Sequence, residues 1–414
     1  MGDPLTSTKS KDYSALSAKK AAILLVIAEL LGMSLWFTAS AVTPYLQERW
    51  TLDATQAGWL TTVVQLGFVA GTAAAALLNL ADIWPARWYV ATSSFLAAIA
   101  NSLVIALDDY TLALMARFAT GLFLAGVYPP GMKMMATWFA QNRGLAIGAL
   151  VGGITVGKAA PYLIRALDIS ASFVMLSASA GAVIGGLMIA IWYREGPHTF
   201  ERRAFSWSLV GTVVRHRETR LAIGGYLGHM WELYAMWTLV AVFFFDYFAA
   251  RGADTATTIA ASGVVAFLVI AAGGLGCVIA GRWADKLGRA RITIWSMAVS
   301  GFCALLIGWL LHAPLPLVLP LALVWGFAVV ADSAQFSALV TEVAPKHAVG
   351  TALTLQTSLG FLLTAFSIWL AIRLHESWDW RIAFGMLAIG PALGIVAMRR
   401  FQTLRAHQAA SNPV

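Results

Sequence analysis

Apolar segments long enough to cross a lipid bilayer follow one another along almost the whole chain. A transmembrane helix needs about 20 consecutive, mainly apolar residues. Twelve segments fit this length, six before a charged stretch and six after it: 21–46, 54–80, 88–107, 110–138, 144–167 and 170–193, then 221–246, 256–280, 291–311, 313–342, 348–372 and 380–399. The segments at 110–138 and 313–342 are longer than a bilayer requires, so we expect these two helices to tilt or protrude.

The pattern predicts an all-α membrane protein of twelve transmembrane helices in two six-helix bundles. We expect a tail at 1–20, a first bundle at 21–193, a charged central loop at 194–220, a second bundle at 221–400 and a tail at 401–414. The two bundles repeat, because an offset of 203 residues takes Glu29 onto Glu232 and Asp82 onto Asp285. A duplicated unit of this kind is typical of transporters, which commonly place their substrate site between the halves.

Composition supports a chain surrounded by lipid. Hydrophobic residues make up 59% of the sequence and charged residues only 12%, whereas soluble domains carry about a quarter charged residues. If the N-terminus is cytoplasmic, 20 of the 28 Lys and Arg residues fall on the cytoplasmic side, five on the other side and three within spans. This split follows the positive-inside rule and predicts a cell-membrane protein with both termini in the cytoplasm. It also accounts for the net charge of +8 without nucleic acid.

Signatures of other protein classes are absent from the sequence. Cys277 and Cys303 lie in apolar stretches without ligand-like neighbours, which favours neither a disulfide nor a metal site. The chain has no G-x-x-x-x-G-K-[ST] phosphate loop and no H-E-x-x-H motif. We therefore expect no ATP-driven transport by this chain, no metal and no cofactor. The basic N-terminal tail has no cleavage-type site, so we expect the first apolar segment to be retained as a span.

One motif lies between the eighth and ninth segments, where Gly281, Asp285, Gly288 and Arg289 follow the pattern G-x-x-x-D-x-x-G-R. Gly281 permits close helix approach, Gly288 turns the chain, and Asp285 can accept from Arg289 or from a helix N-terminus. The first-half copy keeps Asp82 but lacks the glycines. In the fourth segment, Arg117 begins an R-x-x-x-G-x-x-x-G pattern.

These motifs resemble those of the major facilitator superfamily, and the resemblance extends from residue 21 to residue 400. It implies two bundles that rock about a central cavity in alternating access, with the Asp285 motif acting as a conformational latch. It also implies that the first, fourth, seventh and tenth helices line the cavity. Because the first-half copy has lost its glycines, the resemblance leaves the latch role of Asp82 open.

Ionisable side chains at bilayer depth usually face the protein interior or a cavity. The sequence places seven there: Glu29, Arg117, Lys133, Lys158, His229, Glu232 and Asp332. Glu29, Glu232 and Asp332 are the candidates for proton coupling, because a carboxyl group that alternates between a dry site and a cationic partner can take up and release a proton. Candidate substrate contacts are Arg117, Lys158 and His229, together with the aromatic residues Trp36, Tyr128 and Tyr234.

Each candidate also has a structural interpretation. Arg117 can staple neighbouring helices, Lys133 can snorkel to the cytoplasmic surface, and Lys158 can pair with a carboxylate instead of a ligand. His229 can be a buried polar residue whose bonds are satisfied inside the protein. Most of the tryptophans suit interface anchoring or packing.

The sequence therefore predicts a proton-coupled secondary transporter, not an enzyme, that moves a small organic anion by symport and works as a monomer. A rival hypothesis is proton-driven efflux of lipophilic or cationic compounds, favoured by the acids and aromatic residues. Hypotheses of another class are a membrane-embedded enzyme, in which His229 and Glu232 would do acid–base work, and a non-transporting sensor.

Overall fold

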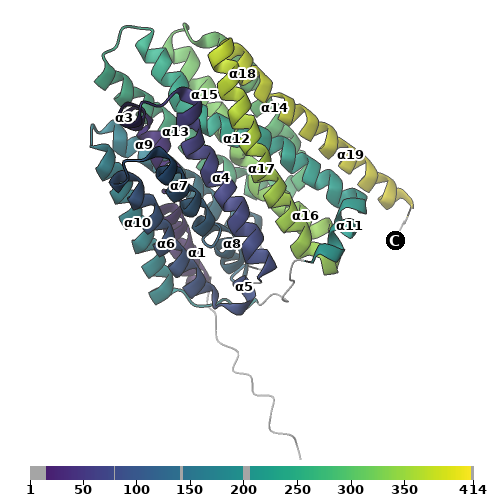
Figure 1. Ribbon diagram of the computed structural model, residues 1–414. Coiled ribbons are helices and arrows are strands. Elements are labelled where there is room, and N and C mark those ends of the chain that lie inside the picture. Colours follow the sequence, from purple (N-terminus) through teal and green to yellow (C-terminus); the bar gives the residue numbers. More distant parts are fainter. Residues whose placement is uncertain (1–14, 79, 140–142, 199–205, 412–414) are drawn as a thin grey trace, which may run out of the picture.

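The computed structural model describes residues 15–411 except 79, 140–142 and 199–205. The described part is almost entirely helical and contains no β-strand. Two groups of helices lie side by side, and each group comes from one half of the chain (Figure 1). We call the side on which α1 begins and α19 ends the terminal face, and the other side the far face.

The first half runs from α1 to α10. Its helices are α1 (Ala15–Met33), α2 (Thr38–Ala41), α3 (Thr43–Trp50), α4 (Ala54–Leu77), α5 (Leu80–Ile83), α6 (Ala86–Ala106), α7 (Tyr110–Leu124), α8 (Tyr128–Ala136), α9 (Arg143–Ala166) and α10 (Ala171–Trp192). The short helix α11 (Trp207–Arg215) connects the halves. It lies within the stretch 194–220 that the sequence predicts as a loop, so that prediction was incomplete.

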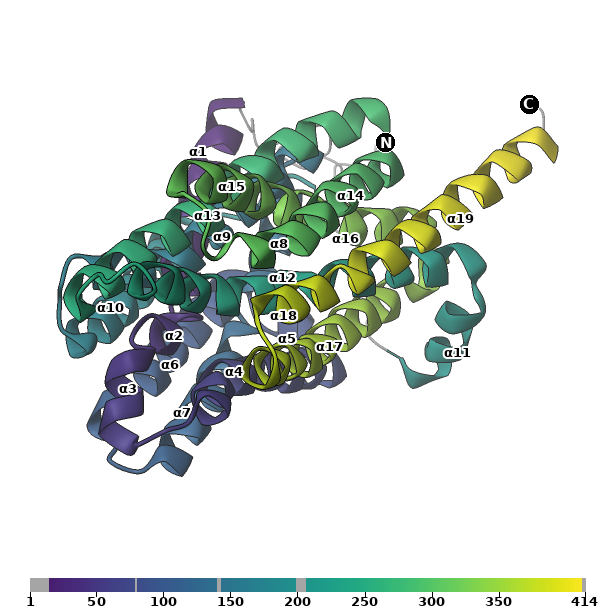
Figure 2. The ribbon, with the colours of Figure 1, turned by 90° about the horizontal axis from the view of Figure 1, so that it is seen from above.

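The second half runs from α12 to α19. Its helices are α12 (Arg217–Ala249), α13 (Thr255–Leu287), α14 (Arg289–Ile307), the 3-10 helix η1 (Gly308–Leu310), α15 (Leu315–Ala331), α16 (Ser333–Val343), the 3-10 helix η2 (Lys346–Ala348), α17 (Val349–Ser377), α18 (Trp380–Leu387) and α19 (Ile389–Ser411). Of the second-half helices, α13 and α17 pack against the first half, and, viewed from above, α14 and α19 lie on the outer side (Figure 2).

The first crossing is interrupted. Eleven helices of the described chain are long and apolar enough to cross a membrane, and the segment predicted at 21–46 is not among them. Helix α1 carries Lys19, Lys20 and Glu29 within 19 residues and ends at Met33, and the chain then continues through α2 and α3. Taken together, α1–α3 form the twelfth crossing of the fold.

The two longest predicted segments are broken helices instead of single tilted ones. The segment 110–138 is divided into α7 and α8, and Pro129 and Pro130 stand in the first turn of α8. Proline cannot donate a backbone hydrogen bond and disfavours helical geometry in the residue before it, so the chain breaks here. The segment 313–342 is divided into α15 and α16 at Asp332.

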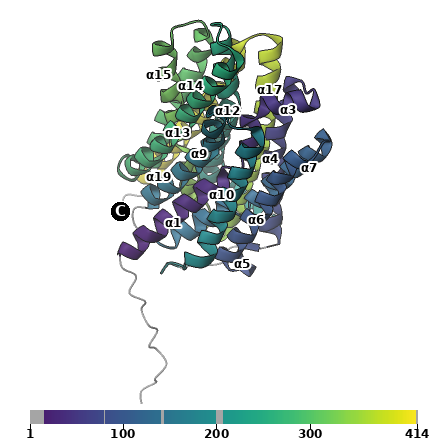
Figure 3. The same cartoon turned by 90° about the vertical axis from the view of Figure 1, so that its left-hand side faces the viewer.

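Two seams join the halves. Helices α9 and α13 pack along a line of glycines: a Cβ on Gly148 would lie 2.6 Å from the Cys277 carbonyl oxygen, and one on Gly152 would lie 2.8 Å from that of Gly274. On the other side of the molecule, α4 packs against α17, where a Cβ on Gly58 would meet the side chain of Ile372. Figure 3 shows the α9 and α13 side. Small residues let backbones approach closely in membrane helices.

Candidate substrate site between the halves

Lys158 lies at the junction of the two halves. It projects from α9 of the first half and is 2% exposed. Its Nζ donates a hydrogen bond of 2.5 Å to the hydroxyl of Tyr234, which belongs to α12 of the second half. The same Nζ lies 4.1 Å from the ring centre of Trp36 and 5.2 Å from that of Trp237. The ammonium group therefore contacts side chains of both halves.

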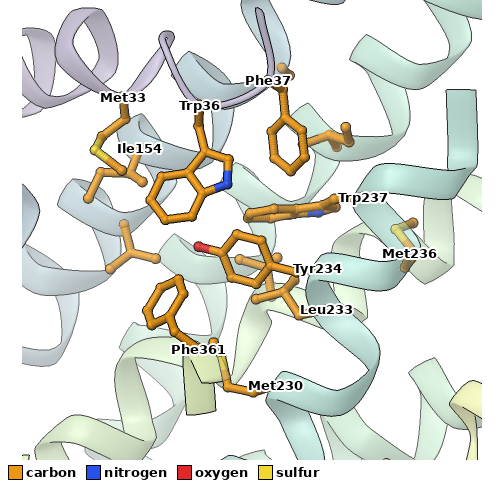
Figure 4. Packing of buried hydrophobic residues seen from close by; sticks show 14 of the residues in the cluster. Met33, Trp36, Phe37, Ile154, Met230, Leu233, Tyr234, Met236, Trp237 and Phe361 are labelled. Atoms are coloured by element: carbon orange, nitrogen blue, oxygen red, sulfur yellow. The ribbon is translucent and has the colours of Figure 1, made fainter. Parts of the chain in front are cut away.

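Three aromatic rings lie beside the Lys158 Nζ, and further rings pack against these three. We call them the aromatic box: Trp36, Phe37, Phe68, Tyr234, Trp237 and Phe361. The ring centres of Trp36 and Tyr234 are 5.4 Å apart, and those of Tyr234 and Phe361 are 5.2 Å apart. Figure 4 shows five of the six rings converging from opposite halves. Because Trp36 and Phe361 belong to different halves, the box closes only when the halves meet.

Two hydrogen-bond donors in the box have no partner in the described chain. They are the buried indole nitrogens of Trp36 and Trp237. No carboxylate of the described chain lies within 4 Å of the Lys158 ammonium. Buried polar groups are normally hydrogen-bonded. A cation and neutral donors without acceptors form a site that suits an anion.

Glu29 is the acid whose charge acts on Lys158. It lies on α1, is 2% exposed, and its Oε2 has no hydrogen-bond partner in the described chain. Its Oε1 occupies the space beside Gly131 of α8, where an added Cβ would lie only 1.8 Å away. The absence of a side chain at Gly131 therefore makes room for this carboxyl group.

Glu232, which the repeat matches with Glu29, has a different environment. One carboxylate oxygen accepts from the Trp325 indole at 2.7 Å, and the other accepts from the Ser300 hydroxyl at 2.8 Å. Both donors belong to the second half. The repeat therefore places the two acids on equivalent helices, but the two carboxyl groups have different surroundings.

His229 and Asp332 form a buried pair inside the second half. The His229 Nδ1 lies 2.8 Å from Asp332 Oδ1, and each side chain is 1% exposed. Asp332 stands at the break between α15 and α16, and the rings of Tyr226 and Phe336 pack around the imidazole. The substrate contact predicted for His229 and the proton role predicted for Asp332 stay predictions. Their contact favours a single site to which both side chains contribute.

Arg117 is fully buried on α7 and bonds to the protein around it. Its guanidinium donates to the carbonyl oxygens of Leu35, Trp36 and Leu60 and to the side chains of Thr38 and Asn101. Leu35 and Trp36 belong to the turn between α1 and α2, where backbone acceptors have left the helical pattern. Arg117 thus holds the turn that presents Trp36 to the box. A direct substrate contact stays a prediction, and these bonds favour the structural interpretation.

Two further predicted residues belong to α8. Tyr128, in the first turn of α8, is partly buried, and its ring stacks on that of Phe68 at 6.3 Å. Lys133 lies one turn further along α8 and is exposed. The box itself contains Phe37, Phe68 and Phe361, which the sequence analysis did not select. The repeat could have identified Phe361, because the offset that pairs Glu29 with Glu232 also takes Lys158 onto Phe361.

The motif around Asp285 lies at the terminal face. The sequence places this motif between two apolar segments, but most of it is helical, because α13 continues through Leu287 and only Gly288, with φ +90°, ends it. A Cβ on Gly144 of the first half would lie 2.5 Å from Asp285 Oδ1, and one on Gly281 would lie 2.6 Å from the Gly144 carbonyl oxygen. The motif therefore packs directly against the start of α9.

Arg289 contacts more than Asp285. It donates to Glu342 and to Gln335, each at 2.7 Å, and lies 3.6 Å from Asp285 Oδ1. It thereby connects the ends of α13, α14 and α16. The side chain of Asp82, the predicted first-half counterpart, lies outside the described residues.

Comparisons with known proteins agree with this architecture. The family model for the Major Facilitator Superfamily matches residues 24–252 and 249–413. A glycerol-3-phosphate transporter of Bacillus subtilis (strain 168) is 26% identical over 385 residues, which cover 85% of each chain. A shikimate transporter of Escherichia coli (strain K12) is 31% identical over 212 residues, which cover 46% of this chain and 47% of that relative.

A solved structure of the nucleoside transporter NupG superposes with a TM-score of 0.70 at 14% identity, covering 92% of this chain and 99% of that one. This likeness shows the fold. With the family model matching both halves and twelve crossings arranged in two bundles, the chain belongs to the Major Facilitator Superfamily, whose members found here are transporters of small solutes.

Proposed function

We propose that this protein carries a small organic anion across the membrane by alternating access, and that Lys158 is the group that binds the anion. The observation that carries the proposal is the buried Lys158 side chain at the junction of the halves, which has no ion-pair partner in the described chain. Its contacts are one hydroxyl and three aromatic rings.

The Lys158 side chain has no anionic partner in the described chain to offset the cost of burying its charge. Transferring an ion into a low-dielectric interior costs several kcal/mol. Cation–π contacts recover about 2 kcal/mol when the ammonium group is desolvated. A bound anion would add charge-assisted hydrogen bonds to Lys158, which are roughly twice as strong as neutral ones. It would also supply an acceptor for the indole N–H groups of Trp36 and Trp237.

The relatives support the same class of substrate. Glycerol 3-phosphate and shikimate are a phosphate ester and a carboxylic acid, and both are anions at neutral pH. Neither relative fixes the substrate of this chain. They favour a small anionic solute.

Export of cationic or lipophilic compounds is the second candidate, supported by the aromatic rings. The structure favours the anion, because the rings of Trp36, Tyr234 and Trp237 already contact the protein's own ammonium group. A cationic substrate placed there would be repelled by Lys158 unless that residue lost its charge.

Proton coupling is part of the proposal, and Glu29 is its leading residue. Glu29 and Lys158 both belong to the first half and lie within electrostatic range of each other. An anion bound to Lys158 would neutralise the ammonium group and withdraw its stabilising effect from the Glu29 carboxylate. A proton taken up by Glu29 would then restore neutrality, so anion and proton would move together.

A ligand screen on the purified protein tests the substrate class. Glycerol 3-phosphate, shikimate, inorganic phosphate and a lipophilic cation such as tetraphenylphosphonium are added separately, and the unfolding temperature is measured. We expect stabilisation by at least one of the organic anions and none by the cation, because ligands that bind only the folded state raise its stability. Stabilisation by the cation alone would refute the anion proposal.

We also propose that the terminal face is cytoplasmic, that the membrane is the cell membrane, and that the transporting unit is a monomer. The distribution of Lys and Arg supports the orientation. Ser208 lies on the terminal side and Thr255 on the far side, and both are exposed. Cysteine labelling from outside intact cells should reach a cysteine at Thr255 and not one at Ser208; the reverse result would invert the orientation.

A further inference from the structure

A basic cavity opens at the terminal face on the outer side of the second half, away from the aromatic box. Its volume is about 610 Å³, and α14, α16 and α19 line it. The side chains of Arg289, Arg291, Arg399 and Arg405 contribute to its wall, with Glu342 as the one acid. The cavity therefore carries an excess of positive charge.

Two of the four arginines are paired with acids, and, among the described residues, two are not. Glu342 is bonded to Arg289 at 2.7 Å, and Arg405 is bonded to Glu218 at 2.9 Å. Arg291 and Arg399 are exposed and have no side-chain hydrogen bond or ion pair within the described chain. Helix α14 begins here at Arg289 after Gly288, which provides no side-chain cap, and both residues line the cavity. Helix N-termini favour negative charge.

An apolar strip continues from the cavity along the outer surface. Trp295 lines the cavity and is 51% exposed, and Val299 and Phe302 follow it at helical spacing on α14 with 43% and 60% exposure. On the neighbouring helix α19, Val396 and Leu393 are also exposed. In a membrane protein such an exposed apolar strip faces the acyl chains of lipid.

We propose that this cavity binds the headgroup of an anionic phospholipid whose acyl chains lie along the strip of Trp295, Val299 and Phe302. The basic cavity and the apolar strip adjoin each other, and this combination favours a lipid over a soluble anion. A soluble phosphate needs only the arginines, whereas a phospholipid also covers the apolar strip. Basic pockets between helices at the cytoplasmic membrane surface are known to recognise anionic headgroups. This inference is independent of the substrate proposed above.

The test compares two double variants of equal charge in purified protein. Arg291→Gln with Arg399→Gln removes the two arginines without partners from the cavity. Arg282→Gln with Arg400→Gln removes two exposed arginines of the same face that do not line it. Native mass spectrometry then measures the binding of phosphatidylglycerol and phosphatidylcholine to each protein.

We expect the wild type and the Arg282/Arg400 variant to prefer phosphatidylglycerol. The Arg291/Arg399 variant should bind it about thirtyfold more weakly, since each basic residue near an anionic headgroup contributes about fivefold. If that variant is not recovered folded, Arg399→Gln alone should show about a fivefold loss. Equal losses in both double variants, or no preference for phosphatidylglycerol in the wild type, would overturn the proposal. Competition by free glycerol phosphate as strong as that by the lipid would identify a soluble anion site instead.

Discussion

Glu29 and Glu232 illustrate how the surroundings of a buried acid decide what it can do. Both are at most 2% exposed. Glu232 accepts hydrogen bonds on both oxygens from Trp325 and Ser300, whereas Glu29 has an oxygen without a partner in the described chain and interacts electrostatically with Lys158. A carboxylate with a cationic neighbour that a substrate can neutralise is suited to proton exchange.

We therefore expect Glu29→Gln to abolish proton-driven accumulation while retaining exchange of substrate between the two sides. Gln keeps the shape of Glu and cannot titrate. The matched variant Glu232→Gln should lose less coupling, because both oxygens of Glu232 already accept hydrogen bonds within the second half. Uptake and counterflow in proteoliposomes with an imposed pH gradient measure both properties. Full gradient-driven accumulation by Glu29→Gln would remove this acid from the mechanism, and Asp332 would be tested next.

The sequence predicted which ionisable side chains are buried, but it did not predict which residues they contact. The position of Lys158, Arg117 and Glu29 within apolar segments showed that they would be buried. The bond between Lys158 and Tyr234 joins residues 76 positions apart, and it depends on how α9 and α12 face each other. Arg117 likewise bonds to a turn at Leu35 and Trp36 that hydrophobicity alone does not reveal.

The glycine seam between α9 and α13 fixes the position of the Asp285 motif. Gly144 leaves room for Asp285, and the close approach of Gly281 to Gly144 brings the two helix ends together. The charged side chain, Asp285, belongs to the second half, and Gly144, which leaves space for it, belongs to the first half. The motif can therefore hold the halves together only while the terminal ends of α9 and α13 stay adjacent.

This arrangement predicts that Gly144→Ala will imitate Asp285→Asn. The added methyl group would lie 2.5 Å from Asp285 Oδ1, so it must displace the carboxylate, while the substitution to Asn removes its charge. Both variants should transport more slowly with normal amounts of folded protein in the membrane. Gly211→Ala in α11 is the control, because its Cβ would meet nothing within 4 Å.

Kinetics of uptake in membrane vesicles, normalised to protein abundance, compare the three variants with the double variant Gly144→Ala, Asp285→Asn. The double variant should be little slower than either single one if both act on the same latch. Independent, additive losses would show that the contact between Gly144 and Asp285 does not serve as a latch.

Hydrophobicity along the sequence predicted where the helices lie. The breaks within them depend on local sequence features, which the length of an apolar segment does not reveal. Pro129 and Pro130 supply a reason for the break before α8. The break at Asp332 has no proline at the junction, so only packing around the buried His229–Asp332 pair distinguishes it. The extension of α13 to Leu287 exceeds the apolar segment because the last two turns pack on α9.

At the scale of the whole molecule, the central site is made by both halves. Lys158 comes from the first half, Tyr234, Trp237 and Phe361 come from the second, and Trp36 closes the box from the first. The repeat in the sequence predicted two halves and a site between them. It did not predict that the two copies would contribute different groups, a lysine at 158 and a phenylalanine at the equivalent 361. Rocking of the halves would open the box and expose the ammonium group.

The most direct measurement is anion uptake by proteoliposomes that contain the Lys158→Gln variant, with glycerol 3-phosphate and shikimate as the labelled solutes. The matched control is Lys20→Gln, which removes an exposed lysine near the start of α1. Losing one partner of a buried charge pair costs about 3 kcal/mol, so Lys158→Gln should transport about a hundredfold more slowly while Lys20→Gln behaves like the wild type. Wild-type uptake of either anion that persists unchanged in folded Lys158→Gln protein would contradict the account.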